Sequence, residues 1–260
     1  MSSFNFDSAV AAFRRYTASF EQKDPLIALK YDHTFGVVQT SLELSNALRL
    51  NEEDTSLAAL IALLHDIGRF WQVDQSGSFT DTQQLDHAAY GCQLLFDEGH
   101  IREYLADCRF DALLRFAIAN HSAFSIAPCP DPQMLLHARL IRDADKLDNF
   151  RVKDITSIET LLQVSPQELN RASLSPQIYE QFLHCRQIRR EDRKTPLDIY
   201  VSYIAFLFDL NFSASYHWLK KHDYVSRLFQ RLSPHNPATE RQLYELNKSA
   251  QRHIRERLDA

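Results

Sequence analysis

The sequence contains few of the residues that make tight turns or covalent crosslinks. It has five glycines, nine prolines and four cysteines in 260 residues. So few glycines and prolines argue against an all-β fold, in which turns recur every few residues. The cysteines show no CxxC spacing, so we expect reduced thiols and neither a disulfide framework nor a zinc ribbon.

Long hydrophobic runs and a strong charge of one sign are also missing. The apolar stretches Leu57–Leu64 and Ile199–Leu207 are too short to span a bilayer. The first residues, MSSFNFDSAVAAFRRY, have no basic segment followed by an apolar run, as a signal peptide would. We therefore expect a cytoplasmic protein that does not enter a membrane. The formal net charge of −5 does not favour nucleic acid as a bulk partner.

Helix signals follow one another along the chain, and 45% of its residues are apolar. Asp or Asn before a proline or an acidic turn is a typical helix start. We predict helices from Pro25 to about Leu48, from Glu52 to a stop at Gly68, from Asp86 to about Gly99, from Asp111 to His121 and from Pro132 to about Phe150; Thr195-Pro196 and Asn236-Pro237 open two more. Loops are expected at Trp71–Gln84 and Ser122–Pro130.

These signals predict an all-α fold. We expect a helical core over residues 1–155 and a C-terminal helical extension over residues 156–260. The extension would pack on the core to form one compact unit.

His33 lies on the apolar stripe of its predicted helix. At helical spacing the stripe consists of Leu26, Leu29, Val37 and Leu44. A histidine in such a place is either a hydrogen-bonded core residue or a metal ligand.

His65 and Asp66 follow the apolar run LAALIALL. Both can reach one ion if it lies beyond the helix end. A buried carboxylate is costly unless it is paired or bound to a metal. The alternative, an exposed Asp beside a terminal His, is disfavoured by Leu64 and Ile67 on either side.

Asp143 and Asp145 differ in their surroundings on the predicted helix. Asp143 has Arg139 and Lys146 at positions where surface ion pairs form. Asp145 shares its stripe with apolar residues and needs a strong partner. We therefore choose Asp145 as the metal ligand and expect Asp143 at the surface or behind the ligands.

The order of these residues resembles the HD superfamily of metal-dependent phosphohydrolases. The matching positions are His33, then His65-Asp66 in LLHDIG, then Asp145 in DADKLD. The resemblance implies an HD-domain helical bundle with additional C-terminal helices. It also implies that these four residues bind a divalent metal.

Two further histidines, His87 in LDHAAYG and His121 in RFAIANHSAF, stand where dinuclear branches of the family carry extra ligands. Their alternative role is that of helix-terminal histidines with local hydrogen bonds. As ligands they would hold a second ion, with Asp66 bridging the two. The resemblance thus implies one or two divalent ions (Mn, Fe, Co, Ni, Zn or Mg), since mixed nitrogen and oxygen ligands do not select among them.

The function implied is hydrolysis of a phosphomonoester or phosphodiester of a small, nucleotide-like molecule. Asp66 would orient the attacking water, and Arg69 and Lys146 would donate to phosphate oxygens or be no more than surface charges. Two alternatives stay open: a di-iron oxygenase acting on a small polar substrate, and a non-catalytic nucleotide-binding sensor.

Overall fold

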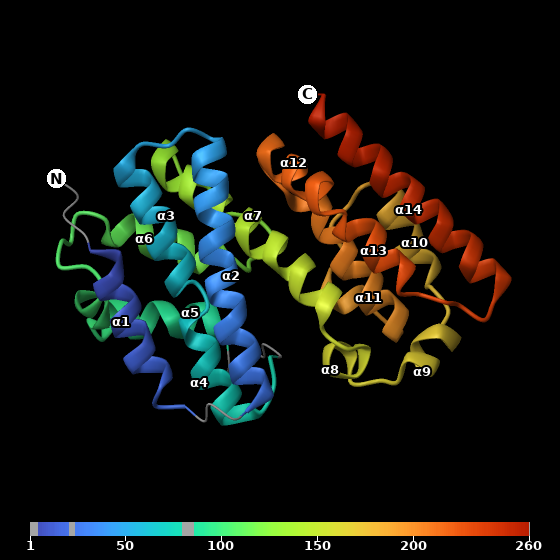
Figure 1. The fold of residues 1–260 in the computed structure, drawn as a ribbon, viewed down its shortest axis with the longest axis horizontal. Coiled ribbons are helices and arrows are strands. Elements are labelled where there is room, and N and C mark those ends of the chain that lie inside the picture. The colour runs from blue at the N-terminus through green and yellow to red at the C-terminus, as the bar shows by residue number, and fades with distance from the viewer. Residues whose placement is uncertain (1–4, 21–23, 80–85, 260) are drawn as a thin grey trace. The chain divides into compact units, whose positions relative to one another are not determined.

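The computed structural model describes residues 5–20, 24–79 and 86–259, and every regular element in them is a helix (Figure 1). The predicted all-α class is thereby confirmed. The chain divides into two compact units, residues 1–148 and residues 149–260. None of the described helices is both long enough and apolar enough to cross a membrane.

The helices of the first unit carry all the predicted site residues. They are α1 (Phe6–Thr17), α2 (Pro25–Ala47), α3 (Glu52–Leu64), α4 (Ile67–Ser76), α5 (His87–Cys92), the π-helical turn η1 (Gln93–Asp97), the 3-10 turn η2 (His100–Glu103), α6 (Asp111–Asn120) and α7 (Pro132–Ile155), whose last residues belong to the second unit.

Side-chain caps confirm the predicted starts of α2 and α3. The Asp24 carboxylate accepts from the amide of Leu26 at the start of α2, and the Asn51 side chain accepts from the amide of Asp54 at the start of α3. Such caps satisfy amides that have no partner inside the helix. The helix predicted to end near Phe150 continues to Ile155.

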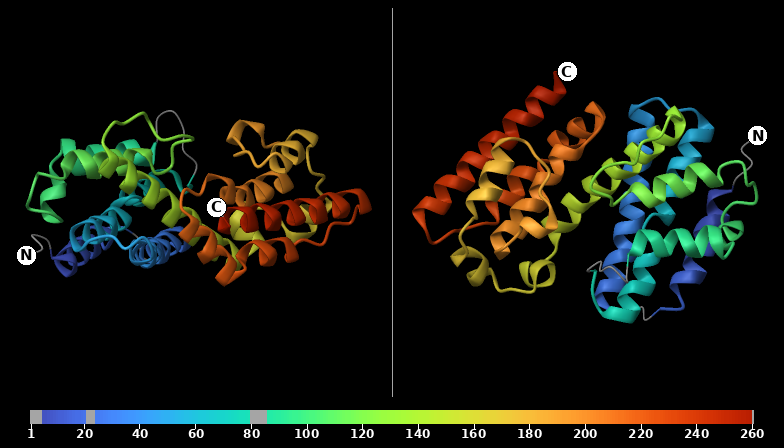
Figure 2. Two further views of the ribbon diagram at one scale, coloured as in Figure 1. Left: turned by 90° about the horizontal axis from the view of Figure 1, so that it is seen from above. Right: turned by 180° about the vertical axis from the view of Figure 1, so that it is seen from behind.

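Helix α3 is the centre of the first unit. Every residue from Leu57 to Leu64 is buried, and α3 packs along α2. The two helices stay side by side in all the views (Figures 1 and 2). Because α3 is buried on all sides, the two residues that follow it, His65 and Asp66, emerge inside the unit and not at its surface.

Gly68 does not stop a helix, contrary to the prediction. Helix α3 ends at Leu64, and Gly68 lies in the first turn of α4. A Cβ atom at Gly68 would lie 2.2 Å from the carbonyl oxygen of His87, so the glycine permits the close approach of α4 and α5. Helix α4 ends at Ser76, and its C-cap is Gly77, whose φ of 61° is the left-handed conformation that glycine adopts readily.

The same helix overturns part of a predicted loop. Residues 71–76 of the expected loop Trp71–Gln84 belong to α4, and residues 80–84 lie outside the described residues. The second predicted loop, Ser122–Pro130, is present between α6 and α7.

The second unit is built around its last helix. Its helices are α8 (Ile158–Leu162), α9 (Pro166–Arg171), α10 (Pro176–Leu183), η3 (Arg190–Asp192), α11 (Pro196–Ile204), η4 (Ala205–Asp209), α12 (Ser213–His222), α13 (Tyr224–Gln230) and α14 (Pro237–Leu258). The two predicted starts are confirmed, with Thr195 and Asp198 forming a capping box and Asn236 capping α14. Helix α14 packs against α10, α12 and α13.

Candidate metal centre

Six predicted ligands come together in the first unit, each from a different helix. His33 lies in the middle of α2, His65 caps the end of α3, Asp66 caps the start of α4, His87 is the first residue of α5, His121 caps the end of α6 and Asp145 lies in α7. Five of them are 0–3% exposed, and the Asp145 side chain is 16% exposed. Four ligands therefore lie at helix ends, and the faces of α2 and α7 supply the other two.

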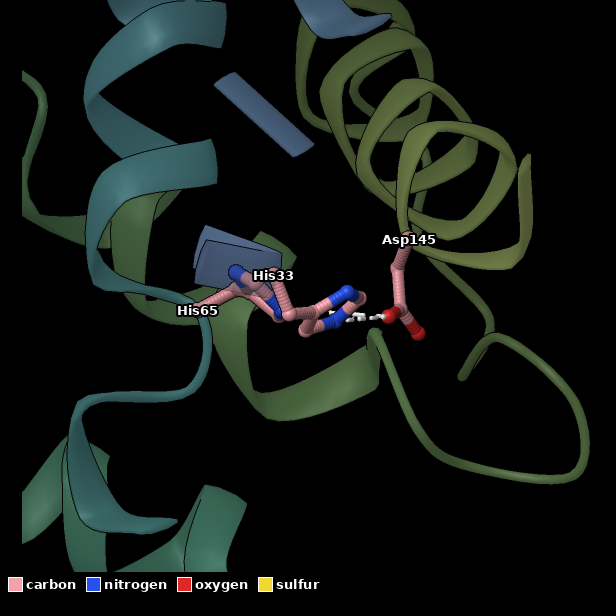
Figure 3. Close-up of side chains that lie close together, drawn as sticks. All are labelled: His33, His65 and Asp145. Atoms are coloured by element: carbon pink, nitrogen blue, oxygen red, sulfur yellow. Dashed lines mark hydrogen bonds and ion pairs between the residues drawn. The ribbon is translucent and has the colours of Figure 1, made fainter. Parts of the chain in front are cut away.

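His33 bridges two carboxylates of α7. Its Nδ1 lies 2.7 Å from Oδ2 of Asp148. Its Nε2 lies 3.0 Å from Oδ1 of Asp145, as Figure 3 shows. If Nδ1 donates to Asp148, the neutral ring presents a bare Nε2 to Asp145. Two acceptors then face each other, an arrangement that a cation between them would stabilise.

Asp148 was not selected from the sequence, although it is 1% exposed. It follows Asp145 by three residues and therefore lies on the same side of α7. The sequence DADKLD did indicate this residue, because Asp148 is an acidic residue at helical spacing from Asp145.

His65 has a buried nitrogen without a hydrogen bond. Its Nδ1 lies 2.8 Å from the carbonyl oxygen of Ala62, the geometry of an N–H donor, which leaves Nε2 as an acceptor. That Nε2 has no hydrogen-bond partner among the described residues, and it lies 3.4 Å from Oδ2 of Asp66 and 3.8 Å from Oδ1 of Asp145. Leaving such an atom unsatisfied costs about 1–3 kcal/mol, so the site favours a cation here.

The two oxygens of Asp66 face different histidines. Oδ2 lies 3.4 Å from Nε2 of His65 and 3.9 Å from Nε2 of His33. Oδ1 lies 3.3 Å from Nε2 of His87 and 3.4 Å from Nε2 of His121. One carboxylate thus stands between two pairs of imidazoles, one pair on each oxygen.

His87 and His121 face each other through their Nε2 atoms at 3.1 Å. The Nδ1 of His121 lies 2.6 Å from the carbonyl oxygen of Ile118, again as a donor, so its Nε2 is an acceptor. Burial lowers the pKa of His121 to about 4, so this ring is neutral at neutral pH. A neutral imidazole is the form that binds metals.

Lys30 also contacts the centre and was missed by sequence reasoning. Its Nζ lies 2.6 Å from Oδ2 of Asp66. Burial would raise the pKa of Asp66, but the charge of Lys30 and the neighbouring imidazoles of His65 and His121 hold it well below its usual range. Lys30 precedes His33 by three residues, so the same helix face that presents the histidine presents the ammonium group.

The other predicted residues are placed as follows. Arg69 donates from Nη1 to the Gln72 side chain at 2.6 Å and to the carbonyl oxygen of Phe79 at 2.9 Å, while its Nε lies 3.6 Å from Oδ1 of Asp66. Lys146 follows Asp145 on α7 and is 9% exposed, so it is not a surface charge. Of the two positions predicted for Asp143, the one at the surface is wrong, because this residue is fully buried.

The donor set fits divalent ions. Ligand atoms of His33, His65 and Asp145 lie within 4.8 Å of one another, and so do those of His65, Asp66 and His121. Two ligand atoms about 2.1 Å from one ion lie roughly 3.0 to 3.4 Å apart at angles of about 90 to 110°. The distances of 3.0 to 3.4 Å between His33 and Asp145 and between Asp66, His87 and His121 agree with that range.

Comparison with known proteins gives one match. Residues 31–149 match the family model of the HD domain, a span that contains all six predicted ligands. No curated protein and no solved structure matches the chain.

Proposed function

Because the chain belongs, through residues 31–149, to the HD-domain superfamily of metal-dependent hydrolases, we propose that it is a phosphohydrolase acting on a small, nucleotide-like phosphate ester, as a phosphomonoesterase or phosphodiesterase. The observation that carries the proposal is Asp66, whose two oxygens stand between two pairs of buried histidines. A carboxylate so placed can bridge two divalent ions.

The residues have distinct roles in this proposal. His33, His65 and Asp145 would hold one ion, His87 and His121 the other, and Asp66 both. Bound divalent ions supply Lewis acidity toward phosphoryl oxygens and activate water at neutral pH. Asp66 orients the attacking water, and the cationic groups of Arg69 and Lys146 donate to phosphate oxygens.

The test begins with protein purified without added metal. Its metal content is measured, the metal is removed, and phosphatase and phosphodiesterase substrates are assayed with Mn²⁺, Fe²⁺, Co²⁺, Ni²⁺, Zn²⁺ or Mg²⁺. We expect hydrolysis that depends on the ion, and loss of both bound metal and activity in Asp66→Asn. Asp74→Asn, an exposed aspartate of α4, is the matched control and should behave as the wild type. Full activity after metal removal would refute the proposal.

A di-iron oxygenase is the second candidate, and the four buried histidines favour it. Together with Asp66 and Asp145 they form a nitrogen-rich set that iron accepts. Two irons per chain, an iron-dependent absorption band and O2 uptake with a small polar substrate would favour oxidation over hydrolysis. Nucleotide binding without turnover of any substrate would favour the non-catalytic sensor.

A further inference from the structure

Arg142 is among the largest fully buried side chains of the described residues, with 2% of its surface exposed. It lies on α7, three residues before the predicted ligand Asp145. Burying a guanidinium group costs several kcal/mol unless hydrogen bonds replace its water. Such a residue is therefore expected to have a specific set of partners.

The partners of Arg142 include backbone carbonyls at the end of α6 and in the turn that follows it. Nη1 donates to the oxygen of Asn120 at 2.8 Å, to that of Ala123, and at 3.5 Å to that of His121. Nη2 lies 3.4 Å from the oxygen of Phe124. The Arg142 side chain thus contacts four backbone carbonyl oxygens within residues 120–124.

Helix α6 needs such a partner. The last carbonyls of a helix lack donors within the helix, and they carry a partial negative charge. Many helices end on a left-handed glycine whose amide supplies the missing donors. Here His121 and Ser122 follow the last residue, Asn120, and neither is glycine. The guanidinium group of Arg142 supplies donors and positive charge instead.

His121 depends on this turn for its orientation. It is the C-cap of α6, and its Nδ1 donates to the carbonyl oxygen of Ile118. With that nitrogen fixed, Nε2 points to Oδ1 of Asp66 and to Nε2 of His87. A shift of the backbone around Asn120 would turn the ring away from both.

We propose that Arg142 is a positioning residue for the second metal ion. It holds the end of α6 so that His121 faces Asp66 and His87, and it does not touch the ion or the substrate. The inference rests on the proposed function. Lysine cannot replace it, because a single ammonium group lacks the planar fork that reaches carbonyls on two sides.

The experiment titrates metal-free protein with Co²⁺ and follows calorimetry and the visible cobalt spectrum. We expect the wild type to bind two ions. In Arg142→Lys the affinity for the second ion should fall about 10–100-fold, while that for the first stays unchanged. Arg139→Lys, an exposed arginine three residues earlier on α7, is the control and should match the wild type. In a His121→Ala background, Arg142→Lys should cause no further loss of affinity.

Three results would overturn the inference. They are wild-type affinity for both ions in Arg142→Lys, equal loss of both ions together with the helical circular dichroism signal, and a wild type that binds a single ion. A wild type that binds no ion at all would refute the proposed function itself.

Discussion

At the scale of single residues, the contact between Lys30 and Asp66 has a consequence for the metal-free protein. The ammonium group lies 2.6 Å from an oxygen that also faces His65 and His33. It therefore places a positive charge on the carboxylate that is proposed to bridge the ions. The Lys30 side chain is 15% exposed and that of Asp66 is 4% exposed, so water screens the pair only slightly.

Lys30→Met should destabilise the metal-free protein by about 3 kcal/mol, because it leaves the Asp66 carboxylate buried without its strongest partner. With saturating divalent ion the loss should shrink, since the ion then carries the compensating charge. Urea unfolding in chelator and in metal measures both values. Lys220→Met, an exposed lysine of α12, should change neither. Equal destabilisation with and without metal would contradict this account of the pair.

The site residues differ in how well the sequence predicts them. His33, His65, Asp66 and Asp145 could be chosen because their apolar surroundings make a histidine or carboxylate expensive there, whereas His87 and His121 were indicated by the resemblance to the HD superfamily. Asp148 and Lys30 were missed because their partners, His33 and Asp66, are distant in the sequence, and only the helix offsets of three residues indicated them. The surface position suggested for Asp143 was wrong because it was inferred from charged neighbours in the sequence. Those neighbours do not prevent the residue from being buried.

At the scale of helices, the approach of α4 to α5 joins two parts of the site. Asp66 caps α4 and His87 begins α5, and Gly68 is the residue at which the two backbones nearly touch. The sequence shows a glycine after HDI but not the reason for it, because the neighbouring backbone comes from a segment nineteen residues away, at His87.

Gly68→Ala should destabilise the protein by about 3 kcal/mol or more and weaken metal binding, because the new Cβ would push the His87 backbone away. Gly77→Ala is the control: no atom of the described residues lies within 4 Å of a Cβ added there, so we expect only the cost of a left-handed alanine, about 1 kcal/mol. Thermal unfolding and metal titration of both variants give the comparison. Equal effects of the two substitutions would show that the contact at Gly68 is not what restricts this position.

At the scale of the whole molecule, all six predicted ligands lie in the first unit. Each unit contains one tryptophan, which can report on the unfolding of that unit. Trp71 is in α4 and Trp218 in α12. The helical class and most helix starts followed from caps that are local in sequence. The packing of residues 156–260 on the core stays a prediction, because it depends on contacts between distant segments.

Metal should raise the unfolding midpoint reported by Trp71 more than that reported by Trp218. An ion at 100 times its dissociation constant adds about 2.7 kcal/mol to the unit that binds it. Fluorescence of Trp71→Phe and Trp218→Phe, each with and without metal, separates the two signals. Equal shifts in both would contradict the expectation, because they would show that the two units unfold as one.

The most direct test of the metal centre is anomalous diffraction from crystals grown with Mn²⁺. We expect two anomalous peaks that share Asp66, one beside His33, His65 and Asp145 and the other beside His87 and His121. Peaks at other side chains, or none in crystals of protein shown to bind Mn²⁺, would contradict the account.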